Sequence, residues 1–178
     1  MQKVKTVDLI LCGLFAALSG ILSQLMIPIG AVPITMTHIP VFLAAGLLGA
    51  KYGTVSQIIF VLLGAAGVPV FAGFSGGIGR ITGPTGGFIV GYILCVFVAG
   101  IITDRWGKSI KILLLAMTCG MITSYFSGLL WYMYITKADF ITGFFICVLP
   151  FLLGDSMKIV FSSFLANRLF PILCSKKS

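Results

Sequence analysis

Long apolar runs follow one another along the whole chain, and charged residues are confined to short groups between them. Of the 178 residues, 59% are hydrophobic and only 9% are charged, whereas an ordinary soluble domain has about 25% charged residues. No polar stretch is long enough to form a separate soluble domain. The sequence therefore predicts a single domain, residues 1–178, that lies almost entirely within a lipid bilayer.

The apolar runs predict six membrane-spanning helices, each of which needs about 20 mostly apolar residues. The second and third runs are shorter than a full span, and the last is longer than one span needs. We expect the last run to hold an interfacial piece up to about Leu149, before the sixth helix. The predicted fold class is an all-α integral membrane protein with six transmembrane helices. The six runs cover about residues 7–27, 39–50, 54–66, 88–102, 112–135 and 140–170.

A glycine-rich segment, residues 67–87, separates the third and fourth predicted helices. Its glycine density makes a regular helix unlikely. Lysine and arginine indicate the orientation, because they accumulate on the cytoplasmic side of a membrane. With a cytoplasmic N-terminus, nine of the twelve lie inside, Arg80 and Lys137 lie outside, and Lys158 lies within the membrane. We therefore expect cytoplasmic N and C termini and a long glycine-rich loop on the outer face.

Asp155 and Lys158 are ionisable residues within the last apolar run. Their i, i+3 spacing places them on one face of a helix, where they can pair. At about 1.5 Å per residue, Asp155 lies roughly 20 Å from Arg168, in the outer half of the membrane. Pro150 and Gly154 indicate that Asp155 is near a helix start, where the helix dipole stabilises its charge. The pair is either part of a substrate site open to the outside or a structural ion pair.

Arg80 is the only charged residue in the glycine-rich segment. Its guanidinium group is suited to bind a carboxylate with two parallel hydrogen bonds, and the glycines let the backbone approach a ligand closely. The alternative is a solvated arginine on a flexible surface loop. The segment is not a phosphate-binding P-loop, because it lacks the GK[ST] ending.

Small residues recur at helical spacing in the first predicted helix, at Cys12, Ala16 and Gly20, with Gly13 and Ala17 beside them. Such stripes allow helices to pack closely in lipid. They serve either internal packing or docking of another membrane protein.

Several other kinds of chemistry find little support in the sequence. His38 has no second metal ligand nearby, and the five cysteines form no CxxC pair, so we expect neither a metal nor a cofactor. With one histidine and four acidic residues, the chain has few candidates for catalysis, and we do not expect an enzyme. The basic residues form no continuous face, so nucleic acid is not an expected partner.

Three regions of the chain resemble the BioY family, the biotin-binding S-components of energy-coupling-factor (ECF) vitamin transporters. The resemblance implies six helices, cytoplasmic termini and a substrate pocket near the outer face of a prokaryotic plasma membrane. It also implies high-affinity biotin capture, with a membrane coupling protein (the T-component) and two ATP-binding subunits as partners. The regions are IPIGAVPITMTH at 27–38; AAGLLGAKYGT at 44–54 with GVPVFAGFSGG at 67–77 and GPTGGFIVGY at 83–92; and GDSMK at 154–158.

The resemblance also implies roles for individual residues. Asp155 and Lys158 match the polar pair that contacts biotin, and Ser75 falls where a family member has a ligand-binding asparagine. Ile89 falls where at least one relative has an arginine, so we take Arg80 as the candidate to hold the biotin carboxylate. The other predicted binding residues are Phe71, Gly73, Phe74, Ile81 and Phe88; the predicted docking residues for the coupling protein are Cys12, which replaces the usual alanine, with Ala16, Gly13 and Ala17.

Three alternatives remain open at this stage. One is an S-component for a different small vitamin. Another is a solitary carrier or channel for a small solute, which would need a continuous polar pathway. The third is an intramembrane enzyme, which the shortage of acidic residues and histidine disfavours.

Overall fold

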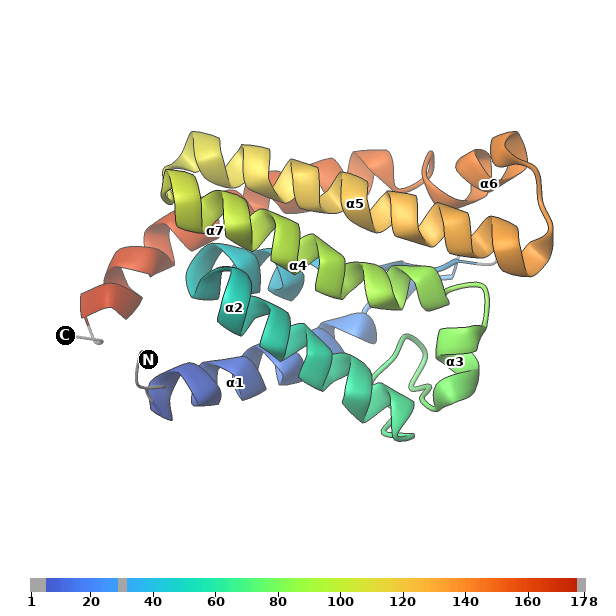
Figure 1. The fold of residues 1–178 in the computed structure, drawn as a ribbon, viewed down its shortest axis with the longest axis horizontal. Helices are drawn as coiled ribbons and strands as arrows, with labels where there is room; N and C mark the ends of the chain where they lie inside the picture. Colours follow the sequence, from blue (N-terminus) through green and yellow to red (C-terminus); the bar gives the residue numbers. More distant parts are fainter. Residues whose placement is uncertain (1–5, 29–31, 176–178) are drawn as a thin grey trace.

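The computed structural model describes residues 6–28 and 32–175. Within them the chain forms an elongated bundle of helices with one very small sheet (Figure 1). The elements in chain order are α1 (Thr6–Ser23), β1 (Met26–Ile27), β2 (Ile34–Thr35), α2 (His38–Ala65), α3 (Ile78–Thr82), α4 (Gly86–Trp106), α5 (Ile110–Thr136), α6 (Phe140–Cys147) and α7 (Leu152–Ser175).

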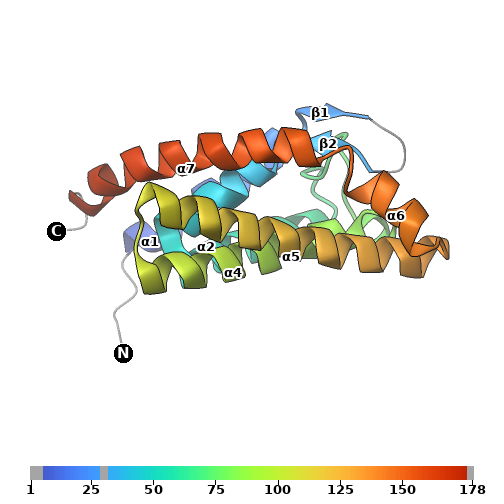
Figure 2. The same ribbon diagram turned by 90° about the horizontal axis from the view of Figure 1, so that it is seen from above.

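The bundle has two distinct ends. The start of α1, the end of α7 and the connection between α4 and α5 lie together at one end, which we call the terminal end (Figure 1). The paired strands, α3 and α6 lie towards the other end, which we call the loop end (Figures 1 and 2). Chain connections at the loop end are longer and less regular, so this is where the fold can build a pocket.

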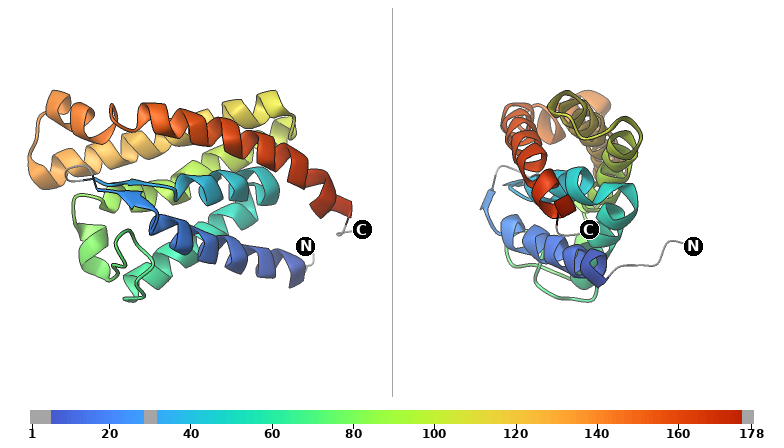
Figure 3. Two further views of the ribbon diagram at one scale, coloured as in Figure 1. Left: turned by 180° about the vertical axis from the view of Figure 1, so that it is seen from behind. Right: turned by 90° about the vertical axis from the view of Figure 1, so that its left-hand side faces the viewer.

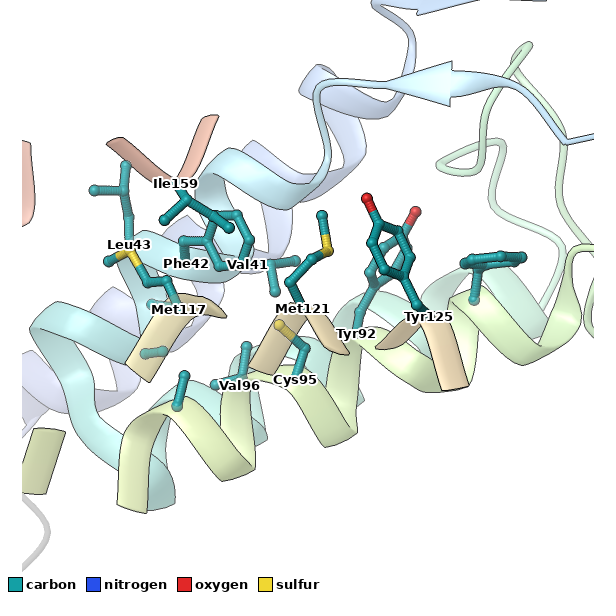
Figure 4. Packing of buried hydrophobic residues seen from close by; sticks show 14 of the residues in the cluster. Val41, Phe42, Leu43, Tyr92, Cys95, Val96, Met117, Met121, Tyr125 and Ile159 are labelled. Atoms are coloured by element: carbon teal, nitrogen blue, oxygen red, sulfur yellow. The ribbon is translucent and has the colours of Figure 1, made fainter. Parts of the chain in front are cut away.

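Buried apolar side chains from α1, α2, α4, α5, α6 and α7 form most of the core between the two ends. α4 packs most extensively against α5 and α2, while α1 lies on α2, and α7 contacts both α2 and α5. Figure 4 shows Phe42 of α2, Val96 of α4, Met117 of α5 and Ile159 of α7 meeting in this core. The helices are thereby held in one closely packed unit.

The outer faces of the helices expose large apolar side chains, among them Ile10 on α1, Phe126 on α5 and Phe164 on α7. Among the described residues, α1, α2, α4 and α5 are each long and apolar enough to cross a membrane. A fifth candidate is α6 together with Leu152–Leu173, two helices bent by 49° at their junction. Contact with lipid accounts for such an exposed apolar surface, so the chain is a multi-pass membrane protein.

α2 is interrupted at Gly49, which has φ +75° and ψ −171°. A Cβ atom added to Gly53 would lie 2.9 Å from the carbonyl oxygen of Ala44, although residues nine apart in a continuous helix are about 13.5 Å apart. The two halves of α2 therefore turn back on each other (Figure 3). The sequence placed this break at residues 51–53, which is wrong, because those residues are helical and Gly49 adopts the left-handed conformation.

Side chains at and just beyond the end of α4 bind backbone groups on both sides of this break. An unsatisfied backbone group in a membrane costs several kcal/mol, so these bonds make the turn tolerable there. Thr103 Oγ1 donates to the Ala45 carbonyl oxygen (3.2 Å), Lys108 Nζ donates to the Leu47 carbonyl oxygen (3.1 Å), and Asp104 Oδ2 accepts from the Ala50 N–H (2.8 Å).

Two local features depart from the all-α prediction. β1 and β2 pair in antiparallel fashion, with Met26 opposite Thr35. The glycine-rich segment contains the short helix α3, so the expectation of no regular helix there is wrong at Ile78–Thr82. Glycine surrounds this helix but is scarce within it, which lets one turn form between Gly77 and Gly83.

Candidate binding site

Asp155 and Lys158 form a buried ion pair near the start of α7. Lys158 Nζ lies 2.7 Å from Asp155 Oδ1, and the two residues are only 6% and 2% exposed. The Tyr125 hydroxyl of α5 donates to Asp155 Oδ2 (2.6 Å), and Lys158 Nζ also donates to the Thr35 carbonyl oxygen of β2 (2.6 Å). The predictions that the two residues pair and that Asp155 is near a helix start are confirmed.

The ion pair lies in the wall of a cavity, which we call the Asp155 cavity. Its wall comes from α2, α4, α5, α7 and the segment before α2. Tyr92 and Tyr125 belong to this wall, and Figure 4 shows their hydroxyl groups pointing to the same side of α4 and α5. The lining residues are Val32, Pro33, Thr35, His38, Phe88, Tyr92, Tyr125, Phe151, Asp155 and Lys158.

A second cavity adjoins the first and reaches the glycine-rich loop; we call it the Arg80 cavity. The two cavities share Val32, Pro33, Thr35, Phe88 and Tyr92 as wall residues. They are therefore adjoining compartments of one candidate site. The remaining lining residues of the Arg80 cavity are Ser23, Thr37, Phe60, Phe71, Ala72, Ser75, Arg80, Thr85 and Ile89.

Arg80 is held in position by the loop that carries it. Its Nε donates to Ser75 Oγ (2.8 Å), and Ser75 Oγ in turn donates to the Ala72 carbonyl oxygen (2.8 Å). The guanidinium group remains exposed at the mouth of the Arg80 cavity, with further N–H donors on its two Nη atoms. This arrangement places a fixed positive charge opposite the ion-paired end of the site.

The glycine-rich loop is also tied to the end of α1. Ser23 Oγ donates to the Val70 carbonyl oxygen (2.5 Å), and Gln24 Nε2 donates to the Phe71 carbonyl oxygen (3.2 Å). Gln24 Oε1 accepts from the Phe74 N–H (2.7 Å). The Phe71 ring is buried against Phe60 of α2, with ring centroids 5.6 Å apart. Residues 70–74 are therefore fixed to two helices despite their glycine-rich surroundings.

The architecture described above is shared with proteins of known structure and name. The BioY family model matches residues 1–174. This chain belongs to the BioY family. A probable biotin transporter BioY of Pyrococcus horikoshii is 39% identical over 168 residues, which cover 94% of this chain and 98% of that protein. The biotin transporter BioY of Thermotoga maritima is 38% identical, over 91% of this chain and 95% of that protein.

A solved structure agrees with the family relationship. The crystal structure of an S-component for biotin from an ECF-type ABC transporter superposes on this BioY-family chain with a TM-score of 0.87. The two share 28% sequence identity, over 95% of this chain and 93% of the other. The family and these relatives are transport proteins, so this chain is not an enzyme.

The structure brings together most, but not all, of the predicted binding residues of this BioY-family protein. Asp155 and Lys158 line one compartment, Phe88 lines both, and Phe71, Ser75 and Arg80 line the other. Three predicted residues line neither compartment: Gly73, Phe74 and Ile81. Of these, Phe74 is 75% exposed.

Four polar residues in the wall of the Asp155 cavity have no binding role predicted from the sequence. Tyr92 and Tyr125 lie inside long apolar runs. A buried tyrosine hydroxyl needs a hydrogen-bond partner, so their presence there could have indicated a polar site. Thr35 contributes a backbone carbonyl, which no sequence pattern reveals. As a lone histidine, His38 suggests only a metal ligand in the sequence. These residues come from four elements, so only the fold shows that they meet.

The four predicted docking residues divide between two faces of α1. Cys12 and Ala16 are buried, at 0% and 2% exposure, and Cys12 Sγ donates to the Tyr52 carbonyl oxygen of α2 (3.2 Å). Gly13 and Ala17 are exposed on the outer face. In this structure Cys12 and Ala16 pack α1 on α2. Gly13 and Ala17 are the two predicted docking residues that remain accessible on the surface.

Proposed function

We propose that this protein captures biotin with high affinity, as the substrate-binding S-component of an ECF-type ABC transporter. The proposal rests on the arrangement of one site: it has a buried polar end at Asp155 and Lys158, aromatic walls, and Arg80 at its mouth. Biotin has the same order of chemical groups: a ureido ring, an apolar thioether body and a carboxylate. The names of the relatives support this ligand.

Each end of the ligand has a candidate partner. Asp155 accepts from a ureido N–H and Lys158 donates to the ureido oxygen, and the surrounding low dielectric strengthens both bonds. Phe71, Phe88 and Tyr92 enclose the apolar body. Arg80, oriented by Ser75, binds the carboxylate at the mouth of the site.

Three predicted binding residues have supporting roles in this proposal. Gly73 has φ +73°, a conformation that glycine adopts without strain, so it shapes the loop. Phe74 is held by the bond from its N–H to Gln24 and contributes its exposed ring as a cover over the entrance. Ile81 packs behind the Arg80 cavity, against the core.

The proposed topology has six membrane crossings: α1, the two halves of α2, α4, α5 and α7. The connection between α4 and α5 places Arg105, Lys108 and Lys111 at the terminal end of the bundle. Because positively charged residues favour the cytoplasmic side, we place both termini in the cytoplasm of a prokaryotic cell, with the loop end outside. The ligand then enters from outside the cell.

The proposed partners are a membrane coupling protein and two ATP-binding subunits. Gly13 and Ala17 form the centre of the proposed docking face, since small exposed residues let a partner helix approach closely. Cys12 and Ala16 contribute indirectly, by seating α1 on α2 so that the outer face is presented.

Titration of the purified protein with biotin tests the proposal directly. We expect tight binding by the wild type and a Kd raised about tenfold or more by Asp155→Asn, because a charged hydrogen-bond acceptor is lost. Mass spectrometry of small molecules that copurify should find biotin. A different vitamin in that sample, or an unchanged Kd in the variant, would contradict the assignment.

A further inference from the structure

His38 is the first residue of α2, and its side chain forms part of the wall of the Asp155 cavity. The residue is only 7% exposed, and no group among the described residues forms a hydrogen bond with its Nε2 atom. The ring is fixed by an edge-on contact with Tyr92, with centroids 5.0 Å apart. Buried polar atoms are almost always hydrogen bonded, so the unpartnered nitrogen of a residue that lines the cavity indicates a partner supplied by a ligand.

The other polar groups of the cavity have partners within the protein. Lys158 uses two of its three N–H groups, one on Asp155 and one on the Thr35 carbonyl oxygen, which leaves one donor for a ligand. Each carboxylate oxygen of Asp155 accepts one hydrogen bond, from Lys158 or from Tyr125, and retains a further lone pair. The protein thus offers one donor, one charged acceptor and the free nitrogen of His38.

A five-membered ureido ring presents a complementary set of groups. It has one carbonyl oxygen, flanked by two N–H groups that point to opposite sides of that oxygen. When Lys158 binds the oxygen, a single carboxylate on one side reaches only one of the two N–H groups. The second N–H then needs an acceptor on the other side of the lysine.

We propose that His38 contacts the ligand and that its Nε2 accepts the second ureido N–H. This inference rests on the proposed biotin function and adds to it the residue that completes recognition of the ring. The imidazole is neutral, with Nε2 unprotonated. His38 thereby selects cyclic ureas that carry both N–H groups over rings that lack one.

Isothermal titration of biotin into the full-length protein, purified without a histidine tag, tests this contact. We expect His38→Leu to raise the Kd about tenfold or more, because one ureido N–H is buried without a partner. His38→Gln retains a side-chain acceptor and should recover part of that loss. Ser162→Ala is the matched control: Ser162 is also buried, with no hydrogen-bond partner among the described residues, but it lines neither cavity. Its Kd should equal that of the wild type.

A second measurement needs no substitution, because His38 is the only histidine of the chain. In protein labelled with ¹⁵N-histidine, saturating biotin should move the Nε2 resonance upfield from the position of a free imine nitrogen. An unmoved resonance with biotin bound, or a His38→Leu variant that binds biotin as the wild type does, overturns the inference and leaves the biotin proposal intact. Wild-type protein that does not bind biotin overturns the proposed function itself.

Discussion

An aspartate and a lysine work together at each end of this bundle, and the two sites use them differently. At the loop end, Asp155 and Lys158 bind each other at 2.7 Å and face a cavity. At the terminal end, Asp104 and Lys108 bind backbone groups on the two sides of the α2 break. In both sites the lysine donates to a main-chain carbonyl oxygen, at 2.6 Å in the first and 3.1 Å in the second.

The difference lies in what each carboxylate binds. Asp104 accepts from the Ala50 N–H and so starts the second half of α2. Asp155 accepts from two side chains and keeps capacity for a ligand. An ionisable residue within a membrane protein is usually taken as a sign of function; here one pair holds the backbone and the other lines a cavity. The partners of a charged residue, and not its presence, separate the two roles.

The largest predicted effect separates stability from binding at the loop end. Lys158→Met leaves a buried carboxylate without its counter-ion, so we expect the free energy of unfolding to fall by about 3–5 kcal/mol, with loss of biotin binding. Replacing both members, Asp155→Leu with Lys158→Met, should recover most of that stability without recovering binding. Thermal unfolding and biotin titration in detergent measure the two quantities. Recovery of biotin binding in the double variant would show that the Asp155–Lys158 pair has only a structural role.

The next effect concerns the terminal end. Gly49→Ala forces a left-handed backbone on alanine and brings its Cβ against the Asp104 carboxylate. We expect destabilisation by about 2–4 kcal/mol and an unchanged Kd for biotin in the molecules that remain folded. Gly13→Ala is the control, because its Cβ would meet no atom within 4 Å and should leave stability unchanged or slightly raised. A selective loss of biotin affinity in Gly49→Ala would show that the α2 break at the terminal end influences binding at the loop end.

The smallest effect isolates the backbone bond made by Asp104. Asp104 is exposed, so in Asp104→Ala water can replace the lost acceptor of the Ala50 N–H. We therefore expect destabilisation of only about 1 kcal/mol, measured as a lower midpoint of thermal unfolding. Asp104→Asn keeps an acceptor and should stay within a few tenths of a kcal/mol of the wild type. Equal destabilisation by both variants would show that the charge matters more than the hydrogen bond.

Local sequence patterns predicted the parts of this molecule that depend on near neighbours. The apolar runs predicted the positions of most helices, and the i, i+3 spacing of Asp155 and Lys158 predicted their pairing. The α2 break was placed two residues too late, because Lys51 looked like the end of an apolar run. The backbone needs a left-handed residue there, and Gly49 provides it.

The rest of the site depends on contacts between residues distant in sequence. Tyr125 meets Asp155 across 30 positions, and Thr35 meets Lys158 across 123. Cys12 and Ala16 are buried on the face of α1 that packs on α2. The sequence leaves packing and docking both open for this stripe, because it does not show which face meets α2. Periodicity identifies the face of a helix, but only the fold identifies its neighbour.

The hydrogen bonds from Ser23 and Gln24 to the glycine-rich loop have a mechanical consequence. Because both residues sit at the end of α1, the loop can shift only by breaking these bonds or by moving that helix with it. The same helix carries Gly13 and Ala17 on its outer face, about two to three turns away from Ser23. A displacement of this loop that keeps these bonds would therefore move the end of the helix whose outer face carries Gly13 and Ala17.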